Sequence, residues 1–203
     1  ITINEADGGQ GGSLMDAVLA IEAIAKFCPR SADVVQAGNF GAIRVLAEYA
    51  SSEQKERLLG PMLKGEKLIA VAMTEPEAGS AATDLKTTAT PDGDGFRING
   101  SKIFTTHGQF ADVFLAYVRY GPGVGGIGSV LIERGQDGFK TGNPVKFMSG
   151  EEWVQLYFDD VYVGPENVLL GEGGFKKQIA GFNVERIGNT ARSLELGRYA
   201  FEI

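Results

Sequence analysis

A polar loop at residues 73–84, MTEPEAGSAATD, carries residue types that can bind a phosphorylated ligand. The residues just before it, 68–73, are all apolar and are typical of a buried strand. At the end of such a strand, Gly79 and the hydroxyls of Thr74 and Ser80 can bring main-chain N–H groups and neutral donors close to a phosphate. An ordinary turn that ends a strand has a similar composition and is the alternative.

Two further segments combine polar and hydrophobic groups. In residues 102–108, KIFTTHG, strand alternation places Phe104 and Thr106 on one side, where they serve either a ligand or the core. In residues 182–188, FNVERIG, Asn183 and Arg186 share one face of a helix. A polar group and a cation on one face can contact the same polar ligand, and two plain surface residues are the alternative.

The composition excludes several classes of protein. With 203 residues, 43% of them hydrophobic, the chain can build a substantial core, and its net charge of −7 argues against a nucleic-acid or anionic-membrane surface. The single cysteine, Cys28, is expected to be a buried structural thiol, which fits a reducing compartment such as a bacterial cytoplasm or the mitochondrial matrix. One histidine, His107, predicts no zinc site, and no membrane span or targeting segment is visible.

The elements that must position these residues follow from periodicity and turn signals. Helices are predicted over residues 13–27, 31–50, 51–63 and 175–203, and strands over 68–74, 85–90, 95–106, 111–120, 128–134 and 154–163. The sequence PDGDG at 91–95 predicts a hairpin, and the absence of helices between the strands favours an antiparallel sandwich or barrel. The last helix carries an apolar stripe suited to a helix bundle: Ala180, Val184, Ile187, Ala191 and Leu194. The predicted class is α+β.

Several segments, in this order and spacing, resemble the acyl-CoA dehydrogenases: VAMTEPEAGSAATD, INGSKIFTTHG, FDDVYVGPENVLLGEGGF and FNVERIG. The resemblance implies an incomplete N-terminal helical domain at 1–66, a middle β-domain at 67–172 and the start of a C-terminal four-helix domain at 173–203. Because both ends look cut, the chain is expected to be incomplete.

The resemblance also implies the ligands. FAD would be bound by two segments, through Met73, Thr74, Gly79, Ser80, Phe104, Thr105 and Thr106. The thioester ligand would be bound by Ser80, Asn183 and Arg186. Phe104 stands where the family often has Trp, and Asn183 where it has Asp. Glu75 is expected to have a structural role in the turn, and Trp153 to pack under the β-domain.

The implied activity is α,β-dehydrogenation of an acyl-CoA to a trans-2-enoyl-CoA in fatty-acid β-oxidation. Electrons would pass to an electron-transferring flavoprotein, and the enzyme would be a homodimer or homotetramer. An acyl-CoA oxidase or flavin monooxygenase on the same scaffold, and a non-catalytic ligand-binding β-domain protein, are the alternatives.

The catalytic base is predicted to be Glu185. Most of the family places its base in a C-terminal segment, but a subset, including isovaleryl- and long-chain acyl-CoA dehydrogenases, places it immediately before the Arg of this helix, where Glu185 stands. At about 100° per residue, Glu185 points away from the Asn183/Arg186 face. The alternative is a structural ion pair with Arg186 or Arg192.

Overall fold

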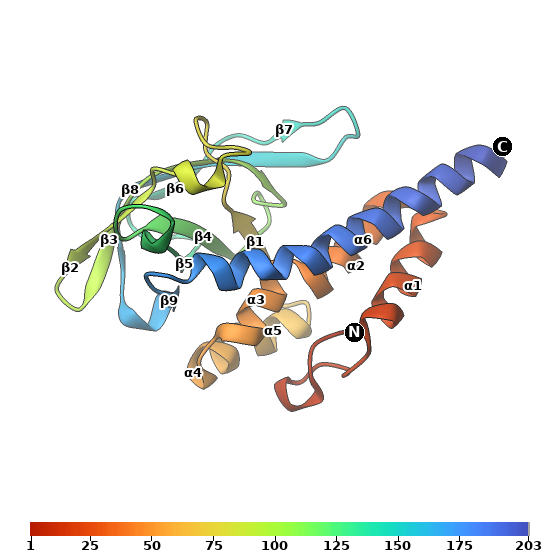
Figure 1. Ribbon diagram of the computed structural model, residues 1–203, viewed down its shortest axis with the longest axis horizontal. Helices are drawn as coiled ribbons and strands as arrows, with labels where there is room; N and C mark the ends of the chain where they lie inside the picture. The colour runs from red at the N-terminus through yellow and green to blue at the C-terminus, as the bar shows by residue number, and fades with distance from the viewer. Residues whose placement is uncertain (203) are drawn as a thin grey trace. The chain divides into compact units, whose positions relative to one another are not determined.

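The computed structural model describes residues 1–202, which fall into two compact units (Figure 1). One unit holds Ile1–Lys64 together with the chain from Lys177 onward, and the other holds Gly65–Lys176. The division into three domains at 1–66, 67–172 and 173–203 stays a prediction. Among the described residues, no helix is both long and apolar enough to cross a membrane.

The first helix, α1 (Leu14–Ala25), begins where the sequence predicts. The Ser13 hydroxyl accepts the N–H of Asp16 at 3.2 Å, and the Asp16 carboxylate accepts the N–H of Ser13 at 2.7 Å. This capping box satisfies two N–H groups that the helix leaves unpaired. Cys28, by contrast, lies in an extended residue before the next helix and is only half-buried, so its expected burial is wrong.

The helix predicted over 31–50 is two helices, α2 (Pro29–Phe40) and α3 (Ala42–Tyr49). Gly41 separates them because its ψ of −142° lies far from the helical region. Pro29 follows α1 and is also the first residue of α2. A proline is tolerated there because the N–H that it lacks would have no hydrogen-bond partner in the first turn of a helix.

The third predicted helix is continuous but widened in the middle. Ser51 and Gln54 form a second capping box, and α4 (Ser52–Gln54) continues through a π-helical turn at Lys55–Leu59 into α5 (Gly60–Leu63). Pro61 has no N–H for the carbonyl four residues earlier and its ring crowds that carbonyl, which a wider turn relieves.

The last helix, α6 (Phe175–Glu202), approaches α2 closely at Gly188. A Cβ at Gly188 would lie 2.7 Å from Phe40 and 2.9 Å from Gln36, so the glycine permits this close approach. Of the predicted apolar stripe, Ala191 is buried, but Ile187 and Leu194 are exposed. The stripe is therefore only partly buried here, because the close helix–helix approach at Gly188 favours a neighbouring face.

The second unit is built on a nine-stranded sheet in the order β6-β8-β3-β2-β4-β5-β9, with β1 on β4 and β7 on β8. The strands are β1 (Ile69–Ala72), β2 (Thr88–Asp92), β3 (Gly95–Thr106), β4 (Val113–Arg119), β5 (Ile127–Glu133), β6 (Phe139–Thr141), β7 (Val145–Lys146), β8 (Glu152–Val163) and β9 (Val168–Leu170). The α+β class is confirmed, and β6, β7 and β9 are short strands that the periodicity did not reveal.

Most strand pairs are antiparallel, as the order of strands without helices favours. The turn at Gly93 and Asp94 joins β2 to β3 and confirms the predicted hairpin. β1 and β2, however, run parallel to β4. The β2–β3 hairpin lies in the connection between β1 and β4 and so serves as the crossover that a parallel pair requires.

Candidate functional site

The loop after β1 reverses direction within four residues. Glu75 and Ala78 exchange two main-chain hydrogen bonds, of 3.1 Å and 3.2 Å, around Pro76 and Glu77. The turn leaves Gly79 and Ser80 exposed, and a Cβ at Gly79 would meet no atom within 4 Å. The small residues of the loop therefore present open main chain, as a ligand-binding loop needs.

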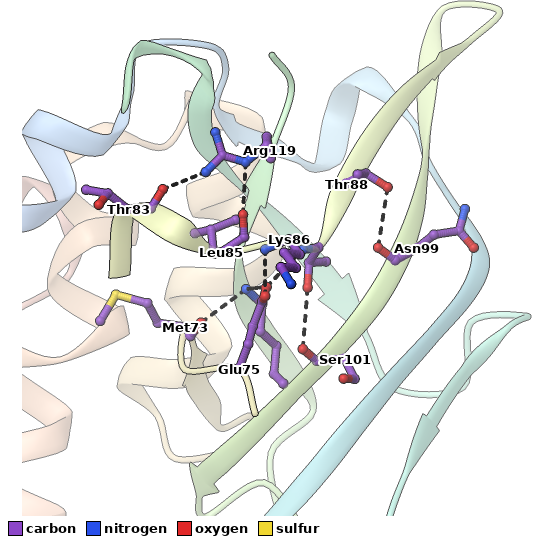
Figure 2. A network of polar contacts seen from close by, with 11 residues as sticks. Met73, Glu75, Thr83, Leu85, Lys86, Thr88, Asn99, Ser101 and Arg119 are labelled. Carbon is purple, nitrogen blue, oxygen red and sulfur yellow. Dashed lines mark hydrogen bonds and ion pairs between the residues drawn. The ribbon is translucent and has the colours of Figure 1, made fainter. Parts of the chain in front are cut away.

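A buried ion pair holds this loop on β3. Lys102 Nζ lies 2.8 Å from Glu75 Oε1, with side chains that are 0% and 6% exposed, and it also donates to the Met73 carbonyl at 3.1 Å. The Glu75 carboxylate further accepts the N–H groups of Lys86 and Thr87, at 2.6 Å and 2.9 Å (Figure 2). The structural role predicted for Glu75 thus has a specific form: one carboxylate joins both ends of the 73–87 loop.

Each charge of the pair shifts the pKa of the other. Burial lowers the pKa of Lys102 to about 8, although Glu75 opposes this shift. Burial also acts to raise the pKa of Glu75, but the Lys102 ammonium and the hydrogen bonds from its neighbours hold that pKa below its usual value. At neutral pH the loop therefore rests on a charged, mutually neutralised pair.

Arg119, at the end of β4, holds the following segment of the loop (Figure 2). Its guanidinium donates to the carbonyls of Thr83 at 2.6 Å and Leu85 at 2.9 Å. It also donates to the carbonyls of Gly121 at 3.2 Å and Gly123 at 2.8 Å. The planar fork of donors thus ties the loop to the glycine-rich connection after β4.

We expect Arg119→Met to lower the free energy of unfolding by about 2 kcal/mol, since several carbonyls lose a charged donor at once. Thermal denaturation of wild type and variant measures this. Arg97→Met is the matched control, because Arg97 pairs with Asp92 and Asp160 on the exposed surface of β3, where solvent screens the charges and the loss is expected to be much smaller. Equal losses in the two variants would show that Arg119 holds nothing beyond an ordinary surface contact.

The end of β3 departs from a regular strand. Ile103 N–H donates to the Thr74 carbonyl at 2.8 Å, and the register with β8 shifts between Lys102 and Thr105. Phe104 adopts a left-handed backbone, with φ of 58°, and its side chain is 50% exposed. Thr106 is half-buried, and both residues lie beside the 73–80 loop; their role in binding a ligand stays a prediction.

Thr105 points the other way. Its side chain is 1% exposed, and its hydroxyl has no hydrogen-bond partner within the described chain. Thr105 is buried as a whole residue, and its carbonyl accepts the N–H of Gly108 at 3.2 Å. His107 follows with φ of 59°, a conformation that agrees with the turn role read from the sequence.

The aromatic side chains beside Phe104 form a cluster that the sequence did not predict. Trp153 lies edge-on to Phe104 with ring centroids 4.7 Å apart, and Phe147 stacks on Phe104 at 6.2 Å. Trp153 is opposite Thr106 in the register of β3 and β8. It therefore packs beside the predicted ligand strand rather than under the β-domain.

The two predicted polar residues of α6 share one exposed face. Arg186 Nη1 donates to Asn183 Oδ1 at 2.9 Å, and the Thr190 hydroxyl donates to the Arg186 carbonyl at 2.8 Å. The pair is thus oriented by its own helix and leaves the remaining donors of the guanidinium for a ligand. Their role in binding a ligand stays a prediction.

Glu185 lies in a different environment on the same helix. It is half-buried, and burial together with the negative charge of Asp33 raises its pKa, against the opposing effect of Arg186. Arg192, named as a possible partner of Glu185, forms an ion pair with Asp33. A carboxyl group with a raised pKa is suited to accept a proton near neutral pH.

Comparison with known proteins places these features in one family. Residues 1–66 match the acyl-CoA dehydrogenase N-terminal domain, and residues 70–161 match the acyl-CoA dehydrogenase middle domain. A short-chain-specific acyl-CoA dehydrogenase of Clostridium acetobutylicum is 34% identical over 199 residues, which cover 96% of this chain and 52% of that protein. The chain thus spans about half the length of the curated relatives it matches.

Solved structures agree. Butyryl-CoA dehydrogenase from Megasphaera elsdenii superimposes with a TM-score of 0.91 at 33% identity, covering 98% of this chain and 54% of that one. A chain from the structure described as "Electron transferring flavoprotein of Acidaminococcus fermentans" gives a TM-score of 0.92 at 32% identity, covering 98% and 54%.

Proposed function

The chain belongs to the acyl-CoA dehydrogenase family, and we propose that the protein is an FAD-dependent enzyme that oxidises an acyl-CoA thioester to its trans-2-enoyl-CoA. The observation that carries the proposal is the junction of the 73–80 loop with the end of β3. There, neutral donors and an exposed aromatic ring are held together by a buried ion pair.

The chemistry of this junction fits FAD. An uncharged flavin ring requires neutral hydrogen-bonding groups and a flat apolar surface. Thr74 and Thr106 supply hydroxyls, Phe104 supplies an exposed ring, and the buried charges of Glu75 and Lys102 neutralise each other. These groups come from segments about thirty residues apart, yet a main-chain hydrogen bond joins them.

Each predicted residue has a specific role in this proposal. Met73 and Thr74 bind the pyrimidine side of the flavin through main chain and hydroxyl, and Phe104 with Thr105 and Thr106 lines the ring. Gly79 and Ser80 approach the pyrophosphate, because no side chain obstructs the main chain at Gly79. When bound, FAD supplies the acceptor for the β-hydrogen of the substrate as a hydride.

The acyl-CoA is bound by polar groups of the chain. Arg186 and Asn183 contact the CoA part, and Ser80 contacts the thioester portion. Glu185 takes the α-proton on a carboxylate oxygen, which a raised pKa favours. Its half-buried position excludes part of the water that would otherwise compete for that proton.

Beyond this chemistry, electrons pass to an electron-transferring flavoprotein, as the description of one structural neighbour suggests. The working form is a homodimer or homotetramer, and the exposed Ile187 and Leu194 on α6 support further helix packing. The proposed compartment is a bacterial-type cytoplasm or the mitochondrial matrix.

The proposal predicts that the full-length protein is yellow and that an acyl-CoA bleaches its flavin absorbance near 450 nm under anaerobic conditions, on the order of one flavin per chain. Absorbance spectra before and after addition of a panel of acyl-CoAs measure this. Absence of bound flavin, with none taken up from added FAD, would contradict the proposal. Rapid release of peroxide in air would assign the protein to the oxidases of the same scaffold instead.

A further inference from the structure

We propose that the β7–β8 hairpin is a third segment of the FAD site, with Phe147 and Trp153 extending Phe104 into one aromatic wall for the flavin ring. The inference rests on the proposed cofactor and adds two residues that the sequence motifs do not include. β7 lies at the projecting end of this hairpin (Figure 1).

The three rings form one group rather than separate pairs. Phe147 and Trp153 have centroids 6.1 Å apart, and both contact Phe104, at 6.2 Å and 4.7 Å. Offset and edge-on arrangements at these distances are the favourable ones for aromatic rings. The group is nonetheless incompletely covered, since Phe104 is 50% exposed and Phe147 is 38% exposed.

The backbone turns Phe104 toward this group instead of the core. A left-handed conformation is unfavourable for a phenylalanine, and the register of β3 against β8 shifts at the same place. Strain of this kind persists where the surrounding structure holds it, and it gathers at ligand sites. An exposed, strained aromatic residue beside neutral hydroxyls is suited to a flat aromatic ligand such as the flavin ring.

The hairpin is also fixed to the turn that follows Phe104. Glu152 accepts a hydrogen bond from Gln109 at 2.9 Å, its main-chain carbonyl accepts the N–H of His107 at 3.4 Å, and its carboxylate lies 3.4 Å from Lys146. Phe147 N–H donates to the Glu151 carbonyl at 2.8 Å, which closes the hairpin. The rings are therefore held in place before any ligand binds, so little ordering opposes binding.

The test uses full-length protein, stripped of flavin and titrated with FAD. Trp153→Leu is expected to weaken FAD binding about 2- to 10-fold, the loss of one aromatic contact, whereas Trp153→Phe keeps a ring and is expected to change it less than about 2-fold. Phe147→Leu, near the hairpin tip, is expected to act like Trp153→Leu without disturbing the core. Phe27→Leu is the matched control, because Phe27 is an exposed aromatic residue of the other unit.

A second readout does not depend on affinity. The difference in tryptophan fluorescence between wild type and Trp153→Phe is the emission of Trp153. Addition of FAD is expected to quench this emission almost completely. Suppose that wild type binds FAD but the Trp153 emission persists, and that Trp153→Leu and Phe147→Leu bind FAD as tightly as wild type. The hairpin is then not part of the site. If wild type takes up no FAD at all, the proposed cofactor itself is wrong.

Discussion

Full-length protein carrying Glu185→Gln is expected to bind FAD and acyl-CoA normally but to reduce its flavin at least about 10³-fold more slowly, the range lost with a general base. Glutamine has nearly the same shape as glutamate, so the packing of α6 is kept, but its amide oxygen does not accept a proton near neutral pH. Stopped-flow absorbance of the flavin after mixing with excess acyl-CoA measures the rate.

The control lies on the same helix. Glu202 forms an exposed ion pair with Lys26, so Glu202→Gln changes one carboxylate of α6 without touching the predicted base. It is expected to reduce its flavin at the wild-type rate. If Glu185→Gln is equally fast, the base lies elsewhere in the protein and Glu185 is structural.

The same residue predicts a pH dependence. Burial and the negative charge of Asp33 raise the pKa of Glu185. On acidification, the Glu185 carboxylate is therefore protonated at a higher pH than the carboxylate of an exposed glutamate. The rate of flavin reduction is therefore expected to fall as the pH drops through this raised pKa and to be constant above it. A rate that stays constant down to the ordinary range of a glutamate would contradict the assignment.

Lys102→Met is expected to have the largest effect on stability, a loss of about 3–5 kcal/mol, as when one partner of a buried pair is removed. Glu75 would remain buried with its negative charge uncompensated, and the Met73 carbonyl would lose its donor. Chemical denaturation of the full-length protein measures the loss, and weaker FAD binding should accompany it because the 73–80 loop is released.

Two variants identify the cause of this loss. Lys86→Met removes the lysine of the exposed pair with Glu77 and is expected to lower stability far less than Lys102→Met, because solvent screens this pair. Glu75→Gln added to Lys102→Met removes the stranded charge and keeps one oxygen, which can accept one of the two N–H groups of Lys86 and Thr87, so it should restore part of the stability. If the second change restores nothing, the loss comes from packing and not from the unpaired charge.

Local features of this protein follow from sequence alone because their interactions span only a few residues. The capping boxes at Ser13 and Ser51 join residues three apart, and the turn at Gly93 joins adjacent strands. The polar face of Asn183 and Arg186 likewise depends only on helical spacing. The resemblance of short segments to the acyl-CoA dehydrogenases, and not spacing alone, indicated which segments carry the predicted ligand-binding residues.

Tertiary structure decided how those segments are held and which side chains join them. Glu75 and Lys102 are 27 residues apart, and Trp153 and Phe104 lie on different strands, so no local pattern indicates that they meet. Phe104 is turned outward by a shift in register with β8, and α6 packs through Gly188 because α2 approaches closely there. In each case the deciding free energy comes from pairing and burial between distant segments, which local spacing does not encode.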